Sequence, residues 1–231
     1  MSDESLFREV DEEVRREQLE KLWKRYGNWF MAFSLGIIVA VAGFKAWQYY
    51  QVKQAEAAGE AYIKALNLYD AGKKEEAALR LADLASGSGK GVATLARMQQ
   101  AAIAAASGKR QEAARIYAEI AADKAIDRPL RDAARIRRAW LMVDEASEED
   151  LRRMLAGLDV DGNPWRASAR EILALAAWRA GRMQEMAGLL DRILNDAETP
   201  PGARERARIM RAVITPKLAA GKAGKTEKSA K

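Results

Sequence analysis

The feature that most constrains the fold is an uncharged run of 19 residues near the amino terminus, Tyr26 to Phe44. It follows Lys24 and Arg25 and ends just before Lys45. As an α-helix the run would be about 28 Å long, close to the roughly 30 Å of a bilayer's hydrocarbon core. Aromatic side chains gather at both of its ends, as is typical of rings that lie at the level of lipid headgroups. The run therefore predicts one transmembrane helix over residues 26–47.

Two other interpretations of this run stay open from the sequence alone. The run could be a buried helix of a soluble domain, but such helices rarely continue this far without a charge. It could be a cleaved signal peptide, because Ala40–Gly43 offers a small-residue cleavage pattern. Against cleavage stand the long, acid-rich segment before the run and the bulky aromatic residues after it. We therefore favour a retained anchor.

Small residues within the run form a candidate surface for a partner helix. Ala32, Gly36 and Ala40 lie four residues apart, so they share one helix face. This face predicts close approach of a second helix inside the membrane and leaves an oligomer open.

Basic residues on the two sides of the run predict its orientation. Six of them precede it, namely Arg8, Arg15, Arg16, Lys21, Lys24 and Arg25. Only Lys45, Lys53 and Lys64 follow within about twenty residues. Residues 1–25 are therefore expected to form a charged cytoplasmic helix, and the chain after the span is expected to be exported.

The exported part contains an internal repeat. Three stretches align on Gly72, Gly108 and Gly181, and the spacing places a missing copy near residue 145, where Glu145 replaces the glycine. Each copy reads as helix, short turn, helix, because glycine favours the left-handed conformation that ends a helix. Amphipathic helix pairs must stack to bury their apolar faces. We therefore predict an all-α fold, in which an α-solenoid of about four helix pairs over residues 48–214 follows the membrane helix.

The end of the chain has a different composition. The stretch "PPGARERARIMRAVI" predicts a final helix that caps the repeats. Residues 215–231 contain five lysines, one glutamate and almost no bulky apolar residue, so they predict a disordered basic tail.

Composition argues against catalysis. The chain has no cysteine and no histidine, which removes thiol nucleophiles, most zinc sites and the commonest general base near neutral pH. The sequence "DVDGN" at 159–163 is similar to a calcium-binding loop, but Pro164 stands where the loop needs glycine, and Arg170 stands where it needs an acid. Basic residues do not alternate with aromatic residues in a stripe. We therefore expect no enzyme activity, no cofactor, no metal and no nucleic-acid partner.

The repeat unit resembles the tetratricopeptide repeat. The pattern Gly-x-x-x-Glu-Ala occurs at Gly72–Ala77 and again at Gly108–Ala113. Ala65, Ala101 and Ala174 stand at the position where the helices of that repeat pack closely, whereas Met186 replaces the alanine of the second helix. The resemblance implies a protein-binding superhelix.

The whole layout resembles the ancillary SecYEG translocon subunit family of the bacterial inner membrane. The likeness rests on the charged leader, the single span, the exit sequence "GFKAWQYY" and a degenerate repeat that contains "GNPWRASAREILALAAWRAG". It implies a non-catalytic, single-pass protein with a cytoplasmic amino terminus and periplasmic repeats. Its implied partners are the export translocon, a periplasmic chaperone or prolyl isomerase, and unfolded clients. A periplasmic scaffold for envelope assembly or cell division predicts the same topology with different partners.

The first helices of such a superhelix are expected to line its concave surface. Counted back from each turn, six residues form a candidate partner-binding groove: Tyr62, Tyr69, Met98, Arg135, Met142 and Trp178. Methionine and aromatic side chains adapt to apolar segments, which favours unfolded clients or a partner helix. The same spacing is also typical of ordinary core residues, and that interpretation stays open.

Overall fold

The computed structural model describes residues 3–229, with side chains over residues 23–218. Within these residues the chain forms nine α-helices and no strand, which confirms the predicted all-α fold. It divides into two compact units, Met1–Ala57 and Ala58–Lys231. The side chains of the predicted leader before residue 23 and of the predicted tail after residue 218 lie outside the described residues.

Helix α1 (Asp3–Asp70) is continuous, so the predicted amino-terminal helix and the predicted apolar helix form one helix. It also continues past residue 47 and supplies the first helix of the first repeat. No proline interrupts this range, and the stretch after the apolar run is rich in alanine, glutamate, glutamine and lysine, which all favour helix. The apolar run and the repeats are therefore joined by helical backbone and not by a loop.

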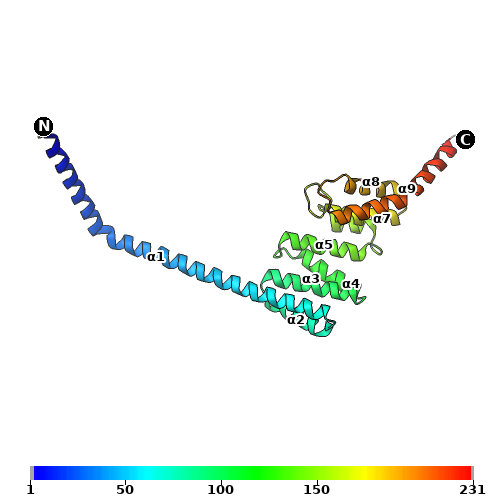
Figure 1. Cartoon of the computed structure of the whole chain (residues 1–231), viewed down its shortest axis with the longest axis horizontal. Coiled ribbons are helices and arrows are strands. Elements are labelled where there is room, and N and C mark those ends of the chain that lie inside the picture. Colours follow the sequence, from blue (N-terminus) through cyan, green and yellow to red (C-terminus); the bar gives the residue numbers. More distant parts are fainter. Residues whose placement is uncertain (1–2, 230–231) are drawn as a thin grey trace. The chain divides into compact units, whose positions relative to one another are not determined.

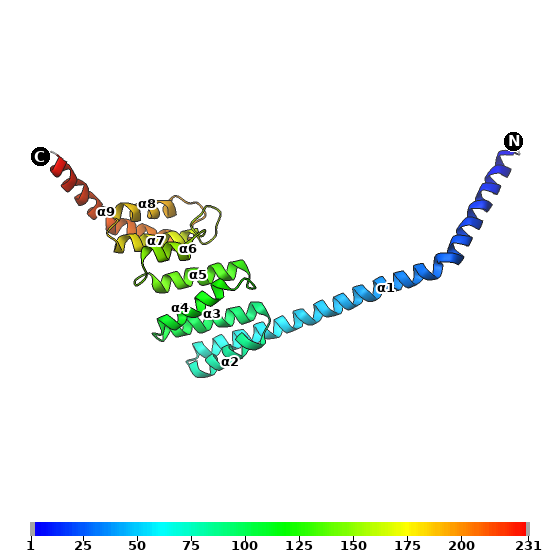
Figure 2. The ribbon, with the colours of Figure 1, turned by 180° about the vertical axis from the view of Figure 1, so that it is seen from behind.

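The second unit is a stack of four helix pairs with a capping helix, as predicted (Figures 1 and 2). The first pair is the end of α1 with α2 (Lys74–Gly87), and the second is α3 (Lys90–Ala106) with α4 (Arg110–Ala122). The third pair is α5 (Arg128–Met142) with α6 (Glu148–Leu155), and the fourth is α7 (Arg166–Arg179) with α8 (Met183–Leu194). Helix α9 (Pro201–Ser229) then covers the end of the stack.

Three of the four turns end on the expected glycine. Gly72, Gly108 and Gly181 have φ angles of 81°, 81° and 73°, in the region that side chains disfavour. The residue after each glycine donates its amide hydrogen to a carbonyl five residues earlier, at N–O distances of 2.9 Å. This hydrogen bond belongs to the Schellman motif, which satisfies carbonyl groups at a helix end.

The third turn differs, and its position corrects the prediction by one residue. The equivalent first-helix alanines, Ala65, Ala101, Ala139 and Ala174, are all fully buried, so the third lies 38 residues after the second. The buried second-helix residues Ala77, Ala113, Leu151 and Met186 have the same spacing. Both series place the turn at Ala146 and not at Glu145. The buried residues on the two sides of each turn are twelve residues apart in all four units, so the extra length of this repeat lies between α4 and α5. No glycine ends α5; Ser147 instead caps α6 and accepts a hydrogen bond from the Asp150 amide at 3.1 Å.

Polar residues mark where the stack begins. The first helices of later units pack on the preceding helix through apolar pairs, which are Ala96 and Ile103, Ala134 and Leu141, and Ala169 and Ala176. At the corresponding positions α1 has Glu60 and Asn67, and both are exposed. A terminal repeat needs such a polar outer face, because no further repeat covers it.

The last helix extends further than expected. Helix α9 includes Pro216 and continues to Ser229, although a disordered tail is expected from residue 215. Alanine, leucine and lysine between residues 217 and 223 favour helix, which accounts for the helical backbone. Disorder of this segment in solution stays a prediction.

Candidate partner-binding surfaces

The first helices of the pairs form the inner layer of the stack. Helices α3, α5, α7 and α9 contact one another in succession, whereas α2, α4, α6 and α8 make no such contact among themselves within the described residues. Helices in the inner layer of a curved stack lie closer together than those in the outer layer. The exposed side of the first helices is therefore the concave face, where the predicted groove residues were placed.

Three of the six predicted groove residues pack partly into the core, and each joins a different cluster. Tyr62 lies against the cluster of Ala65 and Leu81, Met98 against the second cluster, and Met142 against the third. Tyr69 is half-buried and Trp178 is 41% exposed. The six are thus distributed along the stack and do not converge on one pocket.

The shifted register of the third unit changes which residues are equivalent to one another. Six residues before the turns stand Leu66, Ala102, Trp140 and Leu175, all half-buried. The predicted groove positions lie ten and three residues before each turn. Counted from Ala146 they fall on Ile136 and Val143, both buried, instead of Arg135 and Met142. Trp140, which packs partly against the third cluster, is a further candidate for the concave face.

Arg135 stabilises the fold. Its guanidinium donates to the Met154 carbonyl at 2.9 Å and to the Ala156 carbonyl at 2.6 Å, and it pairs with Asp132 at 3.1 Å. The carbonyls at the end of a helix lack intrahelical donors, and Arg135 supplies them for α6. These bonds occupy the guanidinium, which leaves it little freedom to contact a partner.

Trp178 lies where α7 meets α9. The Lys217 ammonium nitrogen lies 5.8 Å from the centre of its ring, a cation–π contact. A second contact lies nearer the start of both helices. There, Arg206 of α9 donates to both carboxylate oxygens of Glu171 of α7, at 2.6 and 2.8 Å. The carboxylate of Glu171 is nearly fully buried, and the hydrogen bond to it raises the pKa of Arg206. These two contacts attach the capping helix to the inner layer.

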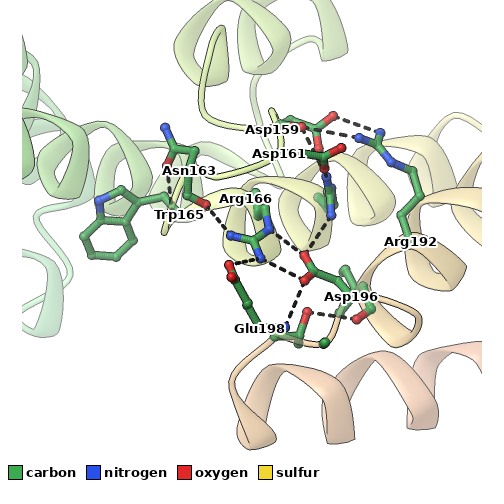
Figure 3. Close-up of polar contacts among 12 residues, drawn as sticks. Asp159, Asp161, Asn163, Trp165, Arg166, Arg192, Asp196 and Glu198 are labelled. Carbon is green, nitrogen blue, oxygen red and sulfur yellow. Dashed lines mark hydrogen bonds and ion pairs between the residues drawn. The ribbon is translucent and has the colours of Figure 1, made fainter.

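An arginine–carboxylate network joins α7 to two loops beside a cleft of about 670 Å³ (Figure 3). Arg166 reaches Asp196 at 2.5 Å and Glu198 at 2.7 Å, both in the loop before α9. Arg170 reaches Asp159 at 2.7 Å and Asp161 at 2.8 Å, in the loop before α7. Both arginines are buried, so these pairs fix the loops.

The network shifts the ionisation of its members. The hydrogen bond from Arg166 lowers the pKa of Asp196 to about 2. Asp196 and Glu198 in turn raise the pKa of Arg166. Burial acts to lower the pKa of Arg170, but the bonds to Asp159 and Asp161 outweigh it and raise the pKa overall. Arg166, Arg170 and Asp196 are therefore charged at neutral pH.

The loop that resembles a calcium site contains a side-chain cation. The Arg170 guanidinium lies between Asp159 and Asp161, the carboxylates that a calcium ion would bind. Over residues 23–218, no group of three or more acidic, histidine or cysteine side chains is arranged to hold a metal.

Most of the apolar run of α1 is exposed; within it only Gly27, beside the Trp23 ring, is buried. None of the 18-residue window that is apolar enough to cross a bilayer is buried by the rest of the protein. Trp29 is 76% exposed, and the predicted packing face of Ala32, Gly36 and Ala40 is exposed as well. Within the described residues this segment does not form part of a buried core, and its span across a membrane stays a prediction.

Comparison with known proteins identifies one family. A family model described as a tetratricopeptide repeat-like domain matches residues 20–183. The match includes the apolar run as well as the first three repeats and α7. No curated protein matches the chain, and no solved structure matches it.

Proposed function

The chain belongs to the tetratricopeptide repeat-like domain family, and we propose that it is a membrane-anchored, non-catalytic module that binds other proteins. Repeats of this kind stack into an extended surface that binds protein partners. The observation that carries the proposal is the continuity of α1, which joins an exposed apolar run to the first repeat without a loop. An anchor of this kind raises the effective concentration of the repeats beside membrane partners.

The proposed location is the bacterial inner membrane, with the amino terminus in the cytoplasm and the repeats in the periplasm. The distribution of basic residues around the apolar run supports this orientation. The bilayer would cover the aromatic side chains that the protein leaves exposed, among them Trp29 and Trp47.

The proposed partners are the protein-export translocon, a periplasmic chaperone or prolyl isomerase, and unfolded exported chains. Support comes from the layout of the sequence, which resembles the ancillary translocon subunits, and from the half-buried Tyr69 and exposed Trp178 of the inner layer. A periplasmic scaffold for envelope assembly or cell division is the second candidate, because it needs the same anchor and the same surface.

Site-specific photo-crosslinking in intact cells tests the proposal. A photoreactive side chain at Tyr69 or Trp178 is expected to capture translocon or chaperone subunits, whereas one at Lys124, exposed after α4, is not. Adducts with division or envelope-assembly proteins would support the second candidate. Equal adducts from all three positions, or none from any, would contradict binding through the inner layer.

A further inference from the structure

The beginning of the repeat stack contains a cleft that the proposed groove does not use. It has a volume of about 590 Å³ and lies between the end of α1 and the start of α2. Ala61, Leu68 and Ala71 supply its apolar surface. Lys64, Lys73 and Arg80 also line it, with Glu76 as the single acid.

The positive charge of this cleft is only weakly compensated. Lys73 reaches Glu76 at 4.0 Å, and Lys64 reaches Glu60 at 2.7 Å, but all four side chains are at least half exposed. Ion pairs between side chains this exposed contribute little free energy, so they break easily. Arg80 makes no ion pair among residues 23–218. The cations can therefore turn to an incoming carboxylate.

The position of the cleft indicates a helix as its occupant. Asn67 also lines the cleft, and its equivalent one repeat later is Ile103. Ile103 packs in one cluster with Leu81 and Leu84 of α2, so the preceding helix lies on this side of α3. Among the residues that the structure describes, no helix lies on the corresponding side of α1. Leu79, which is 69% exposed, lies one helical turn after Glu76 in α2.

Charge makes a second copy of the chain an unfavourable occupant. Head-to-tail stacking would bring the α9 end of one copy to this cleft. Over residues 201–217, α9 has one acid, Glu205, and five bases: Arg204, Arg206, Arg208, Arg211 and Lys217. Like charges placed together across an interface weaken it.

We propose that this cleft binds an acidic amphipathic helix of a partner protein, which adds to the stack ahead of α1. The apolar side of that helix covers Ala61, Leu68 and Ala71, and its carboxylates pair with Lys64, Lys73 and Arg80. This inference rests on the proposed function, because it names the kind of partner and a second binding surface.

A designed peptide pair tests the charge requirement with the full-length protein in uncharged detergent micelles. The acidic peptide copies the apolar positions of α2 and has glutamate at the remaining positions, and the basic peptide has lysine there instead. Fluorescence anisotropy of the labelled acidic peptide is expected to show binding that weakens with salt. The basic peptide is expected not to bind. Equal binding of the two peptides, or no binding of either, would overturn the proposal.

Matched charge reversals test the location. The double variant Lys64→Glu, Arg80→Glu is expected to weaken acidic-peptide binding at least about tenfold. The control double variant Lys90→Glu, Lys124→Glu changes the net charge equally outside the cleft and is expected to have little effect. The pair Lys64→Arg, Arg80→Lys keeps the charges and should retain binding. Thermal melting should be alike for all, since these side chains are exposed; equal weakening by the control would contradict the proposal.

Crosslinking separates this inference from the proposed function. A photoreactive side chain at Ala71 is expected to capture the acidic peptide, and one at Trp178 is not. Capture at Trp178 alone would overturn the cleft but would agree with binding to the inner layer. Competition by anionic lipid vesicles, or self-association lost on reversal of Lys64 and Arg80, would assign the cleft to lipid or to a second copy and refute the proposal.

Discussion

Arg166 and Asp196 form a two-pronged ion pair across the last repeat, with Nε to Oδ2 at 2.5 Å and Nη2 to Oδ1 at 2.8 Å. Asp196 also accepts a hydrogen bond from Arg170 at 3.2 Å, so one carboxylate joins both buried arginines. The pair connects α7 to the loop that precedes the capping helix. The end of the stack thus depends on charge as well as on apolar packing.

Loss of Arg170 should destabilise the repeats. The Arg170→Met variant keeps the apolar stem but leaves Asp159 and Asp161 without their buried cation, while Asp196 keeps Arg166, and this change is expected to cost about 2–3 kcal/mol. Arg192→Met removes a half-exposed partner of Asp159 and should cost less than about 1 kcal/mol. Urea unfolding of the full chain in detergent, followed by circular dichroism, measures both. Equal costs would contradict a central role for Arg170.

Acid should weaken the same region. The pKa of Asp196 is about 2 in the fold and about 3.9 in an unfolded chain, so its contribution is complete above about pH 4 and is lost as the pH falls toward 2. The melting temperatures of the wild type and Asp196→Asn should therefore converge between about pH 5 and pH 2. Asp83→Asn is the control: it removes an exposed carboxylate that forms no ion pair with any residue of 23–218. The difference in melting temperature between this variant and the wild type should not depend on pH. A constant difference for Asp196→Asn would argue against the lowered pKa.

Two glycine substitutions should have opposite signs. Gly108→Ala places a side chain at φ 81° and is expected to destabilise the protein by about 1–2 kcal/mol. Gly188→Ala, within α8, meets no atom within 4 Å of the added carbon and should stabilise by about 0.5–1 kcal/mol. Chemical denaturation of the two variants provides the comparison. A stabilising Gly108→Ala would show that the turn is not left-handed.

Neighbouring leucines of α2 should respond differently to truncation. Leu81 is fully buried between α1 and α3, so Leu81→Ala is expected to cost about 2–5 kcal/mol. Leu79 is 69% exposed, and Leu79→Ala should change stability by no more than about 0.5 kcal/mol. Similar losses for the two variants would contradict the packing of the first pair.

Local signals in the sequence were enough to predict the architecture. The turns at Gly72, Gly108 and Gly181 need a residue in the left-handed backbone conformation, and glycine marks these positions in the sequence. The apolar run stands out by its length and its lack of charge. The register of the third unit could not be predicted in the same way, because its turn has no glycine. Burial of Ala139 and Leu151 determines it, and burial depends on the neighbouring helices.

The candidate surfaces were less predictable. The sequence predicted Arg135 in the concave groove. Its hydrogen bonds to the Met154 and Ala156 carbonyls could not be predicted, because they depend on where α6 ends. The basic cleft is lined by Lys64 of α1 and Arg80 of α2, which lie on the two sides of the turn between these helices. The residue spacing within either helix does not predict that their side chains meet at one cleft. Arg170 replaces the closing acid of a calcium-like loop, and this departure was the one sign of the arginine network in the sequence.

Single-cysteine accessibility in intact cells tests whether the apolar helix crosses the bilayer, because the natural chain has no cysteine. We expect a membrane-impermeant maleimide to label Lys124→Cys once the outer membrane is opened. Ser5→Cys should be labelled only after the inner membrane is broken, and Ile38→Cys only after detergent. Labelling of Ile38→Cys in intact membranes, or of Ser5→Cys and Lys124→Cys from the same side, would contradict an apolar helix that crosses the bilayer and carries the repeats beyond it.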